Sequence, residues 1–296
     1  MEINRKGIIL AGGNGNRLKP LTTSVSKQLM PVYDKPMLYY PLTTLMLAGI
    51  REFLIITNEQ YLSAFKRLLL DGNQWGLKIS YAVQKKPNGI AEAFLIGEDF
   101  LNNEPSALVL GDNLFHSSEM VSLLKKANNQ ISGGTVFTYR VNDPENYGVV
   151  KSDKSGLPIE IIEKPTEFVS SYALTGLYFY DGSVVSKAKS IKPSNRNELE
   201  ISSINSLYLK EGNLEIYRFN RGSAWLDTGN FDSLHQASSY IRTLEKRTGL
   251  KIGCPEEVAW RQGWINSKDL INLAKNSSQS GYGNYLMNLV SESKLN

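Results

Sequence analysis

The chain has 296 residues, 41% hydrophobic and 21% charged, and its 33 basic and 29 acidic side chains leave a net charge of +4. This balance excludes a strongly basic nucleic-acid-binding protein, and no apolar run reaches the about 18 residues that a membrane-spanning helix needs. The single cysteine, Cys254, excludes an internal disulfide, and His116 and His235 are too few to complete a zinc cluster with it. We therefore expect a cytoplasmic protein whose partners include neither a membrane nor a nucleic acid.

Short apolar segments alternate with amphipathic segments over the first half of the sequence. The pattern predicts strands at 8–10, 53–57, 79–83 and 107–110 and helices at 37–48, 60–70 and 91–100. Strands that alternate with helices in this way form a doubly wound, mainly parallel α/β sheet. The ligand of such a sheet binds outside the carboxyl ends of the strands, so the residues that follow 8–10 and 107–110 are candidates for a site.

The rhythm changes after Gly133, where strands follow one another more closely. Strands are predicted at 135–140, 149–151, 159–163, 174–180 and 214–219, and helices at 198–210 and 231–246. From Pro255 onward the pattern is helical, and neither a low-complexity linker nor an internal repeat divides the chain. We predict a mixed, mainly parallel sheet within residues 1–250, followed by a small helical region over residues 251–296.

The segment KGIILAGGNGNR supplies the first candidate site. An apolar strand gives way to the glycines Gly12, Gly13 and Gly15 and then to the cations Arg17, Lys19 and Lys27. Glycine lets backbone N–H groups approach phosphate oxygens, and arginine and lysine neutralise phosphate charge. The spacing does not match a P-loop, and the dinucleotide motif G-x-G-x-x-G lacks its third glycine because Leu18 stands there. The loop predicts a phosphorylated ligand, with an ordinary glycine-rich turn and a Rossmann dehydrogenase as alternatives.

Asp112 follows the apolar strand at 107–110, and Asp227 lies in the segment WLDTG. A carboxylate at the carboxyl end of a strand, beside a phosphate loop, is well placed to hold Mg²⁺, which prefers carboxylate and phosphate oxygens. A helix N-cap for Asp112 and a turn for Asp227 are the structural alternatives.

Several blocks in this order resemble the sugar nucleotidyltransferase family, most specifically its glucose-1-phosphate thymidylyltransferase branch. They are LAGGNGNRLKPLT, SKQLMPV, VLGDN, ENYGVV, EKP, ALTGLYFYD, AWLDTG and GLKIGCPEEVAWRQGWI. The resemblance implies a Rossmann-like nucleotidyltransferase fold and a homotetramer. It also implies that Mg²⁺ assists an in-line attack of glucose 1-phosphate on the α-phosphorus of dTTP. The products would be dTDP-glucose, for dTDP-rhamnose or a related deoxysugar, and pyrophosphate. Within residues 1–250 it implies a nucleotide half over about 1–130 and a sugar-phosphate half over about 131–250.

The resemblance also assigns roles to individual residues. The catalytic set is Arg17, Lys27, Asp112, Lys164 and Asp227, with Asp112 and Asp227 as the metal ligands. The nucleotide set is Leu10, Gly12, Gly13, Gly15, Asn16, Arg17, Gln28, Gln84, Gly89 and Asp112. The sugar-phosphate set is Gly148, Glu163, Lys164, Leu174, Tyr178 and Arg196. A regulatory site for an end-product sugar nucleotide would use Arg221, Gly222, Ile252, Glu256 and Arg261, for which an oligomer interface is the alternative.

Some positions depart from the family pattern. Asn16 stands in place of threonine, Glu92 in place of glutamine, and Ser202 and Ser203 in place of a Thr-Asp pair. The negative charge of Glu92 should disfavour a nearby nucleotide unless the side chain is paired or points away. These departures leave open a paralogue that uses another hexose 1-phosphate or UTP, and a non-catalytic sensor of sugar nucleotides.

Overall fold

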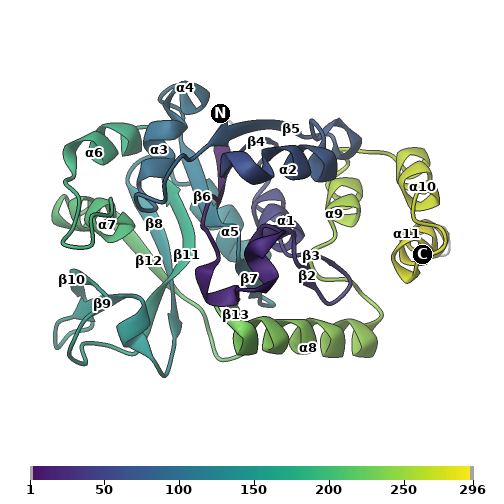
Figure 1. The fold of residues 1–296 in the computed structure, drawn as a ribbon. Helices are drawn as coiled ribbons and strands as arrows, with labels where there is room; N and C mark the ends of the chain where they lie inside the picture. The colour runs from purple at the N-terminus through teal and green to yellow at the C-terminus, as the bar shows by residue number, and fades with distance from the viewer. Residues whose placement is uncertain (1–2, 294–296) are drawn as a thin grey trace.

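The computed structural model describes residues 3–293, which form a central sheet covered by helices (Figure 1). The strands of this sheet are β1 (Lys6–Ala11), β4 (Glu52–Thr57), β5 (Lys78–Val83), β6 (Ser106–Leu110), β8 (Gly134–Arg140), β9 (Gly148–Ser152), β10 (Pro158–Glu163), β11 (Tyr172–Tyr180) and β12 (Leu214–Arg218). Two small two-stranded sheets pair β2 (Pro31–Val32) with β3 (Lys35–Pro36), and β7 (Asn113–His116) with β13 (Ala224–Asp227).

The helices are α1 (Tyr39–Leu47), α2 (Leu62–Leu69), α3 (Glu92–Ile96), α4 (Glu98–Leu101), α5 (Met120–Asn128), α6 (Val184–Ser190), α7 (Ile201–Lys210), α8 (Phe231–Thr248), α9 (Pro255–Arg261), α10 (Ser267–Lys275) and α11 (Gly281–Glu292). Short 3₁₀ turns are η1 (Asn16–Leu18), η2 (Leu21–Thr23), η3 (Lys27–Leu29), η4 (Glu59–Tyr61), η5 (Asn73–Trp75) and η6 (Pro144–Asn146). No helix within residues 3–293 is both long and apolar enough to cross a membrane.

The sheet has a parallel part and an antiparallel part. Strand order is β10-β9-β11-β6-β1-β4-β5, and β8 and β12 continue from β11. β1 pairs in parallel with both β4 and β6, so that Ile9 lies opposite Ile55 on one side and Val109 on the other. Because β1, β4, β5 and β6 are all parallel, the residues that follow them meet at one edge of the sheet. This confirms the predicted α/β fold with a mixed sheet.

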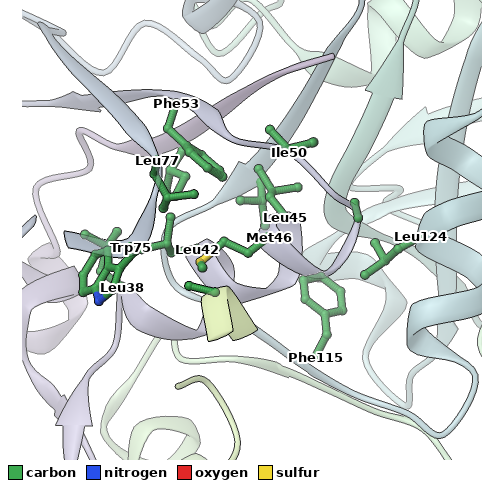
Figure 2. Packing of buried hydrophobic residues seen from close by; sticks show 14 of the residues in the cluster. Leu38, Leu42, Leu45, Met46, Ile50, Phe53, Trp75, Leu77, Phe115 and Leu124 are labelled. Atoms are coloured by element: carbon green, nitrogen blue, oxygen red, sulfur yellow. The ribbon is translucent and has the colours of Figure 1, made fainter. Parts of the chain in front are cut away.

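Both faces of the sheet are buried, which explains the uninterrupted apolar runs of its strands. Ile9 and Val109 contribute to one cluster, while Ile8 and Leu108 contribute to the cluster on the other face. Figure 2 shows part of the first cluster, in which α1 presents its apolar residues to the sheet. The labelled residues are Leu38, Leu42, Leu45, Met46, Ile50, Phe53, Trp75, Leu77, Phe115 and Leu124.

One predicted element was wrong in detail. The single helix expected at 91–100 is two short helices, α3 and α4, because Gly97 ends the first of them. A side chain at Gly97 would also crowd the sheet, since a Cβ there would lie 3.2 Å from a side-chain carbon of Ile8. The four-residue strands β7 and β13 were not predicted.

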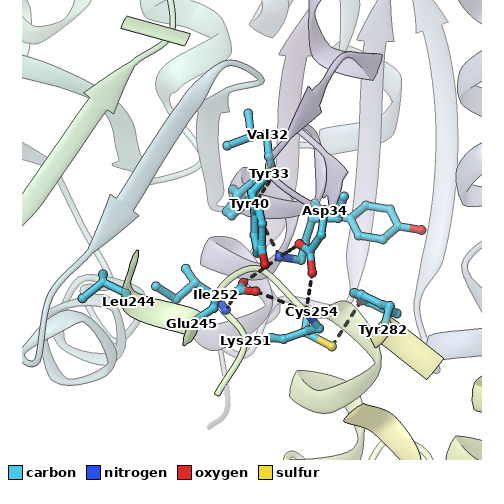
Figure 3. Close-up of polar contacts among 12 residues, drawn as sticks. Val32, Tyr33, Asp34, Tyr40, Leu244, Glu245, Lys251, Ile252, Cys254 and Tyr282 are labelled. Carbon is cyan, nitrogen blue, oxygen red and sulfur yellow. Dashed lines mark hydrogen bonds and ion pairs between the residues drawn. The ribbon is translucent and has the colours of Figure 1, made fainter. Parts of the chain in front are cut away.

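The C-terminal helices share the core of the first cluster. Cys254, Ala259, Leu270 and Leu286 are all buried in it, with α9 packed against α1. A partly buried ionic network also joins this region to the N-terminal part of the chain (Figure 3). Its members are Asp34, Lys35, Glu245 and Lys251.

Candidate active site

The glycine-rich loop follows β1 at the carboxyl edge of the parallel strands. Gly15 adopts the left-handed conformation, with φ of 61°, and the Thr22 hydroxyl donates a 2.8 Å hydrogen bond to its carbonyl oxygen. Gly12 lies against Gln84, since a Cβ on Gly12 would be 2.4 Å from Gln84 Oε1. A Cβ on Gly13 would meet no atom within 4 Å, so this side of the loop is open to a ligand. The loop thus leaves open space beside its backbone at Gly13, and its role as an anion site stays a prediction.

Strands β7 and β13 bring the two predicted metal ligands together. Asp227 lies opposite Asn113, the residue after Asp112, in the antiparallel ladder. The Thr228 hydroxyl donates a 2.9 Å hydrogen bond to the Asp112 carbonyl oxygen, which ties the end of β13 to the start of β7. Asp112 does not serve the alternative role of a helix N-cap, because Glu119 occupies the N-cap position of α5.

Lys27 and Asp112 form an ion pair, and the Lys27 side chain is only 7% exposed. Burial disfavours ionisation of Asp112, but the Lys27 ammonium and the Asn113 amide outweigh it and hold the Asp112 pKa below its ordinary value. Within residues 3–293, Asp227 has no ion-pair partner of this kind. Burial and the nearby Asp112 charge raise its pKa to about 6, although Lys27 and Arg17 partly oppose this. The Asp227 carboxylate therefore lacks the direct ion pair that holds Asp112 ionised.

Asn113 is a site residue that the sequence analysis missed. Its Nδ2 donates to Asp112 Oδ1 at 3.0 Å, while its Oδ1 accepts from Trp225 Nε1 at 2.6 Å and from the Gly176 N–H at 3.1 Å. The side chain is 2% exposed and connects three segments that are far apart in sequence. Its position next to Asp112 in the motif VLGDN was the only available signal.

The predicted sugar-phosphate residues lie on β9, β10 and β11. Glu163 is opposite Gly148 in the β9–β10 ladder, and a Cβ on Gly148 would be 3.1 Å from Glu163 Oε2. Lys164 follows with φ of 43°, a conformation that costs a non-glycine residue about 1–3 kcal/mol. Burial, reinforced by Glu200, raises the pKa of Glu163. Arg196 lies among carboxylates, with Glu163 at 3.7 Å, Glu198 at 3.0 Å and Glu200 at 3.5 Å.

A cleft of about 870 Å³ opens beside these residues. Nine of the predicted site residues line it: Arg17, Asp112, Gly148, Glu163, Lys164, Leu174, Tyr178, Arg196 and Asp227. Asn113 and Trp225 line it as well. The guanidinium of Arg17 reaches the segment after β13, because a Cβ on Gly229 would be 2.9 Å from its Nη2. Cations and carboxylates from widely separated segments therefore share one cavity.

The remaining predicted nucleotide residues lie outside that cleft, around the end of β1. They are Leu10, Gly12, Gly13, Gly15, Asn16, Gln28, Gln84 and Gly89, together with the catalytic candidate Lys27. Gln28 lies beside Gly111, where a Cβ would be 3.0 Å from Gln28 Cγ, and Lys27 connects this group to the cleft through Asp112. Asn16 begins the 3₁₀ turn that carries Arg17 and is exposed.

Gly89 is required by its packing. Its φ is 113°, and a Cβ there would be 2.4 Å from the Leu199 carbonyl oxygen. The negative charge at Glu92 is paired with amides, since the carboxylate accepts hydrogen bonds from Gln84 and Asn88. Asp34, the acidic residue near the dinucleotide-motif position, lies at the β2–β3 turn and pairs with Lys35 and Lys251 instead of facing the glycine loop.

The residues predicted for regulation occupy two separate places. Arg221 and Gly222 are exposed on the turn between β12 and β13. Ile252, Glu256 and Arg261 lie in or before α9, where Glu256 is buried and accepts a 2.6 Å hydrogen bond from the Tyr282 hydroxyl. Across the described part of the chain, no hydrogen bond or ion pair connects the two groups.

No group of three or more His, Cys, Asp or Glu side chains within residues 3–293 has the arrangement of a metal site. Asp112 and Asp227 are thus a pair of carboxylates without a third protein ligand. Mg²⁺ commonly binds through one or two carboxylates and takes its other ligands from water and substrate phosphates. The pair fits a metal of that kind.

Comparison with known proteins gives consistent matches over nearly the whole chain. Residues 6–243 match the family model of the nucleotidyl transferases. The chain is 54% identical over 282 residues to the glucose-1-phosphate thymidylyltransferase of Xanthomonas campestris pv. campestris, with 95% of this chain and 96% of the relative covered. The enzyme of the same name from Neisseria meningitidis is 52% identical, with 96% and 99% covered.

Solved structures agree with this. A Bacillus anthracis protein described as a glucose-1-phosphate thymidylyltransferase, in complex with sucrose, has a TM-score of 0.74 and 40% identity over 80% of this chain and 95% of that one. A UDP-glucose pyrophosphorylase complexed with UDP-glucose has a TM-score of 0.70 and 25% identity, with 82% and 100% covered.

Proposed function

Because the chain belongs to the nucleotidyl transferase family and, within it, to the glucose-1-phosphate thymidylyltransferases, we propose that it makes dTDP-glucose and pyrophosphate from dTTP and glucose 1-phosphate. The observation that carries the proposal is the shared cleft of Arg17, Asp112, Lys164 and Asp227. Two highly charged substrates repel each other, and a cavity lined by cations and by a carboxylate pair suited to a divalent metal offsets that repulsion.

The reaction is an in-line displacement. A phosphate oxygen of glucose 1-phosphate forms a bond to the α-phosphorus of dTTP while the bond from that phosphorus to the bridging oxygen of pyrophosphate breaks. The attacking oxygen is already anionic, so no side chain has to remove a proton. Catalysis therefore consists of positioning and charge stabilisation.

The residues divide the work between the two substrates. We assign the nucleotide to about residues 1–130, with the glycine loop and Arg17 on the triphosphate and Lys27 on the reacting phosphates. We assign the sugar phosphate to about residues 131–250, where Lys164 pairs with its charge and Glu163 accepts hydrogen bonds from sugar hydroxyls. The burial of Lys27 and the constrained backbone of Lys164 support these assignments, because both features fix a cation in place.

Asp112 and Asp227 are our assignment for the Mg²⁺ ligands. Their mutual repulsion contributes to the raised pKa of Asp227, and a cation between them would relieve it. When bound, Mg²⁺ neutralises charge on the α-phosphate. Asn113 keeps the Asp112 carboxylate oriented through its 3.0 Å hydrogen bond.

Pyrophosphate release tests the proposal. Purified protein would be assayed with a panel of nucleoside triphosphates and hexose 1-phosphates, with Mg²⁺ and with EDTA. We expect the highest kcat/KM for dTTP with glucose 1-phosphate, and no turnover in EDTA. A different preferred pair would identify a paralogue, and no release with any pair would indicate a non-catalytic sensor.

We further propose a cytoplasmic homotetramer in which an end-product sugar nucleotide, dTDP-rhamnose, inhibits through a second site. The separation of the exposed Arg221–Gly222 turn from Ile252, Glu256 and Arg261 supports a site that a neighbouring subunit completes. Light scattering would measure the assembly. An initial rate that stays constant up to saturating dTDP-rhamnose would reject the regulatory site and leave these residues as interface.

A further inference from the structure

Glu92, the first residue of α3, accepts hydrogen bonds from two side-chain amides. Gln84 Nε2 donates to Glu92 Oε2 at 2.8 Å, and Asn88 Nδ2 donates to Glu92 Oε1 at 2.8 Å. An ionised carboxylate only accepts hydrogen bonds. The Glu92 carboxylate therefore sets the orientation of the two side-chain amides, because Gln84 and Asn88 must each point an NH₂ group toward it.

The consequence for Gln84 is that its carbonyl oxygen faces the other way. Oε1 lies against the glycine loop, 2.4 Å from where a Cβ of Gly12 would be. Gln84 is only 3% exposed, and Oε1 receives no hydrogen bond from any residue in 3–293. An amide oxygen that receives no hydrogen bond from the protein is an acceptor that a ligand can use.

Pyrimidine bases differ at the atom that such an acceptor would meet. N3 of thymine and of uracil carries a hydrogen and donates, whereas N3 of cytosine is an acceptor. We propose that Glu92 is a positioning residue that locks Gln84 with its oxygen toward the base, so that the site accepts thymine or uracil and rejects cytosine. This inference rests on the proposed function, because it assumes that Gln84 contacts the base of the nucleotide.

A purely structural role for Glu92 is the competing explanation, and the loop has other supports. The Gln84 N–H donates to the Thr57 carbonyl at 2.8 Å, and the Leu199 N–H donates to the Asn88 carbonyl at 2.6 Å. The Ala91 N–H donates to the Leu199 carbonyl at 3.0 Å. These backbone bonds hold both ends of the loop without Glu92. Gln84 Nε2 also donates to the Gly89 carbonyl oxygen, but at 3.4 Å, so the 2.8 Å bond to Glu92 is the shorter of the two that orient the Gln84 amide.

The test compares kcat/KM for dTTP, UTP and dCTP, each with glucose 1-phosphate and Mg²⁺. In Glu92→Leu, the Gln84 amide keeps only the longer 3.4 Å hydrogen bond from its Nε2 to the Gly89 carbonyl oxygen, so we expect the preference for dTTP over dCTP to fall by about tenfold, which is the value of one hydrogen bond. The ratio of dTTP to UTP should not change, because both bases carry the N3 hydrogen. Glu92→Gln should retain discrimination, since its amide oxygen can still accept from Gln84 while the exposed Asn88 turns over. Asn88→Ala is the matched control and should behave as wild type.

In a Glu92→Leu enzyme that is still active, two results would contradict the proposal that Glu92 orients Gln84. One is an unchanged ratio of dTTP to dCTP in Glu92→Leu. The other is an equal fall for all three triphosphates, which is what loss of loop structure would cause. Dissociation constants for dTTP and dCTP, measured without the sugar phosphate, should move with the kinetic ratio. If the wild type released pyrophosphate with no triphosphate, the proposed function itself would fail, and this inference with it.

Discussion

Replacing Asp227 by asparagine should stabilise the ligand-free protein while abolishing its activity. Burial and the Asp112 charge raise the pKa of Asp227 to about 6, against an ordinary value of 3.8. The folded state therefore binds the proton more tightly than the unfolded state does, and the stability that this provides is fully present below pH 3.8 and is lost as pH rises to about 6. These two values differ by about 2.2 (6 minus 3.8), and each pKa unit corresponds to about 1.36 kcal/mol. The ionised carboxylate thus costs the fold about 3 kcal/mol at pH 8 and about half of that at pH 5.

Urea denaturation in EDTA measures this cost. Asp227→Asn should be more stable than wild type by about 3 kcal/mol at pH 8, and its advantage should shrink at pH 5 because wild-type Asp227 is then largely protonated. Asp99→Asn, a change of the same kind at an exposed carboxylate, should shift stability by less than about 0.5 kcal/mol at either pH. A stability difference that is independent of pH, or an Asp227→Asn protein less stable than wild type at pH 8, would refute the electrostatic argument.

Three further predictions follow from the same structure. Lys27→Ala and Lys164→Ala should each lower kcat by at least about 10²–10³ with an unchanged circular dichroism spectrum, whereas the exposed Lys154→Ala should not; near-wild-type turnover would remove that lysine from the chemistry. Lys35→Met should lower the free energy of unfolding by about 1–3 kcal/mol, because Glu245, whose side chain is 5% exposed, loses one of its two cationic partners and keeps only Lys251. Adding Glu245→Leu should recover part of that loss, and additive losses in the double variant would contradict the role of the pair. Gly12→Ala should cost about 1–3 kcal/mol through its clash with Gln84, and Gly13→Ala, where space is open, should stay within about 0.5 kcal/mol of wild type; equal thermal shifts in the two variants would count against the packing argument.

Much of the fold could be predicted from local sequence patterns. The strands of the parallel part are buried on both faces, so apolar runs such as FLIIT mark them without reference to the rest of the chain. The glycine loop is also a local feature, because the left-handed backbone of Gly15 and the close approach of Gly12 to Gln84 both require the absence of a side chain. A helical sequence pattern does not show whether a glycine within it will end the helix. One such glycine is often tolerated, but Gly97 divides the predicted helix into α3 and α4.

The arrangement of the site depended on tertiary structure. Asp112 and Asp227 are 115 positions apart (227 minus 112), and they meet because two four-residue strands, β7 and β13, pair with each other. Strands of that length are too short for their periodicity to identify them. The hydrogen bonds of Asn113 to Trp225 and Gly176, and of Glu92 to Gln84, join residues whose separation carries no sequence signal of contact. The sequence by itself determined the chemical types of the site residues and the strands that present them. Only the folded chain decided which charges lie together and which amide oxygen is left free, because those outcomes depend on long-range pairing and on the direction of individual hydrogen bonds.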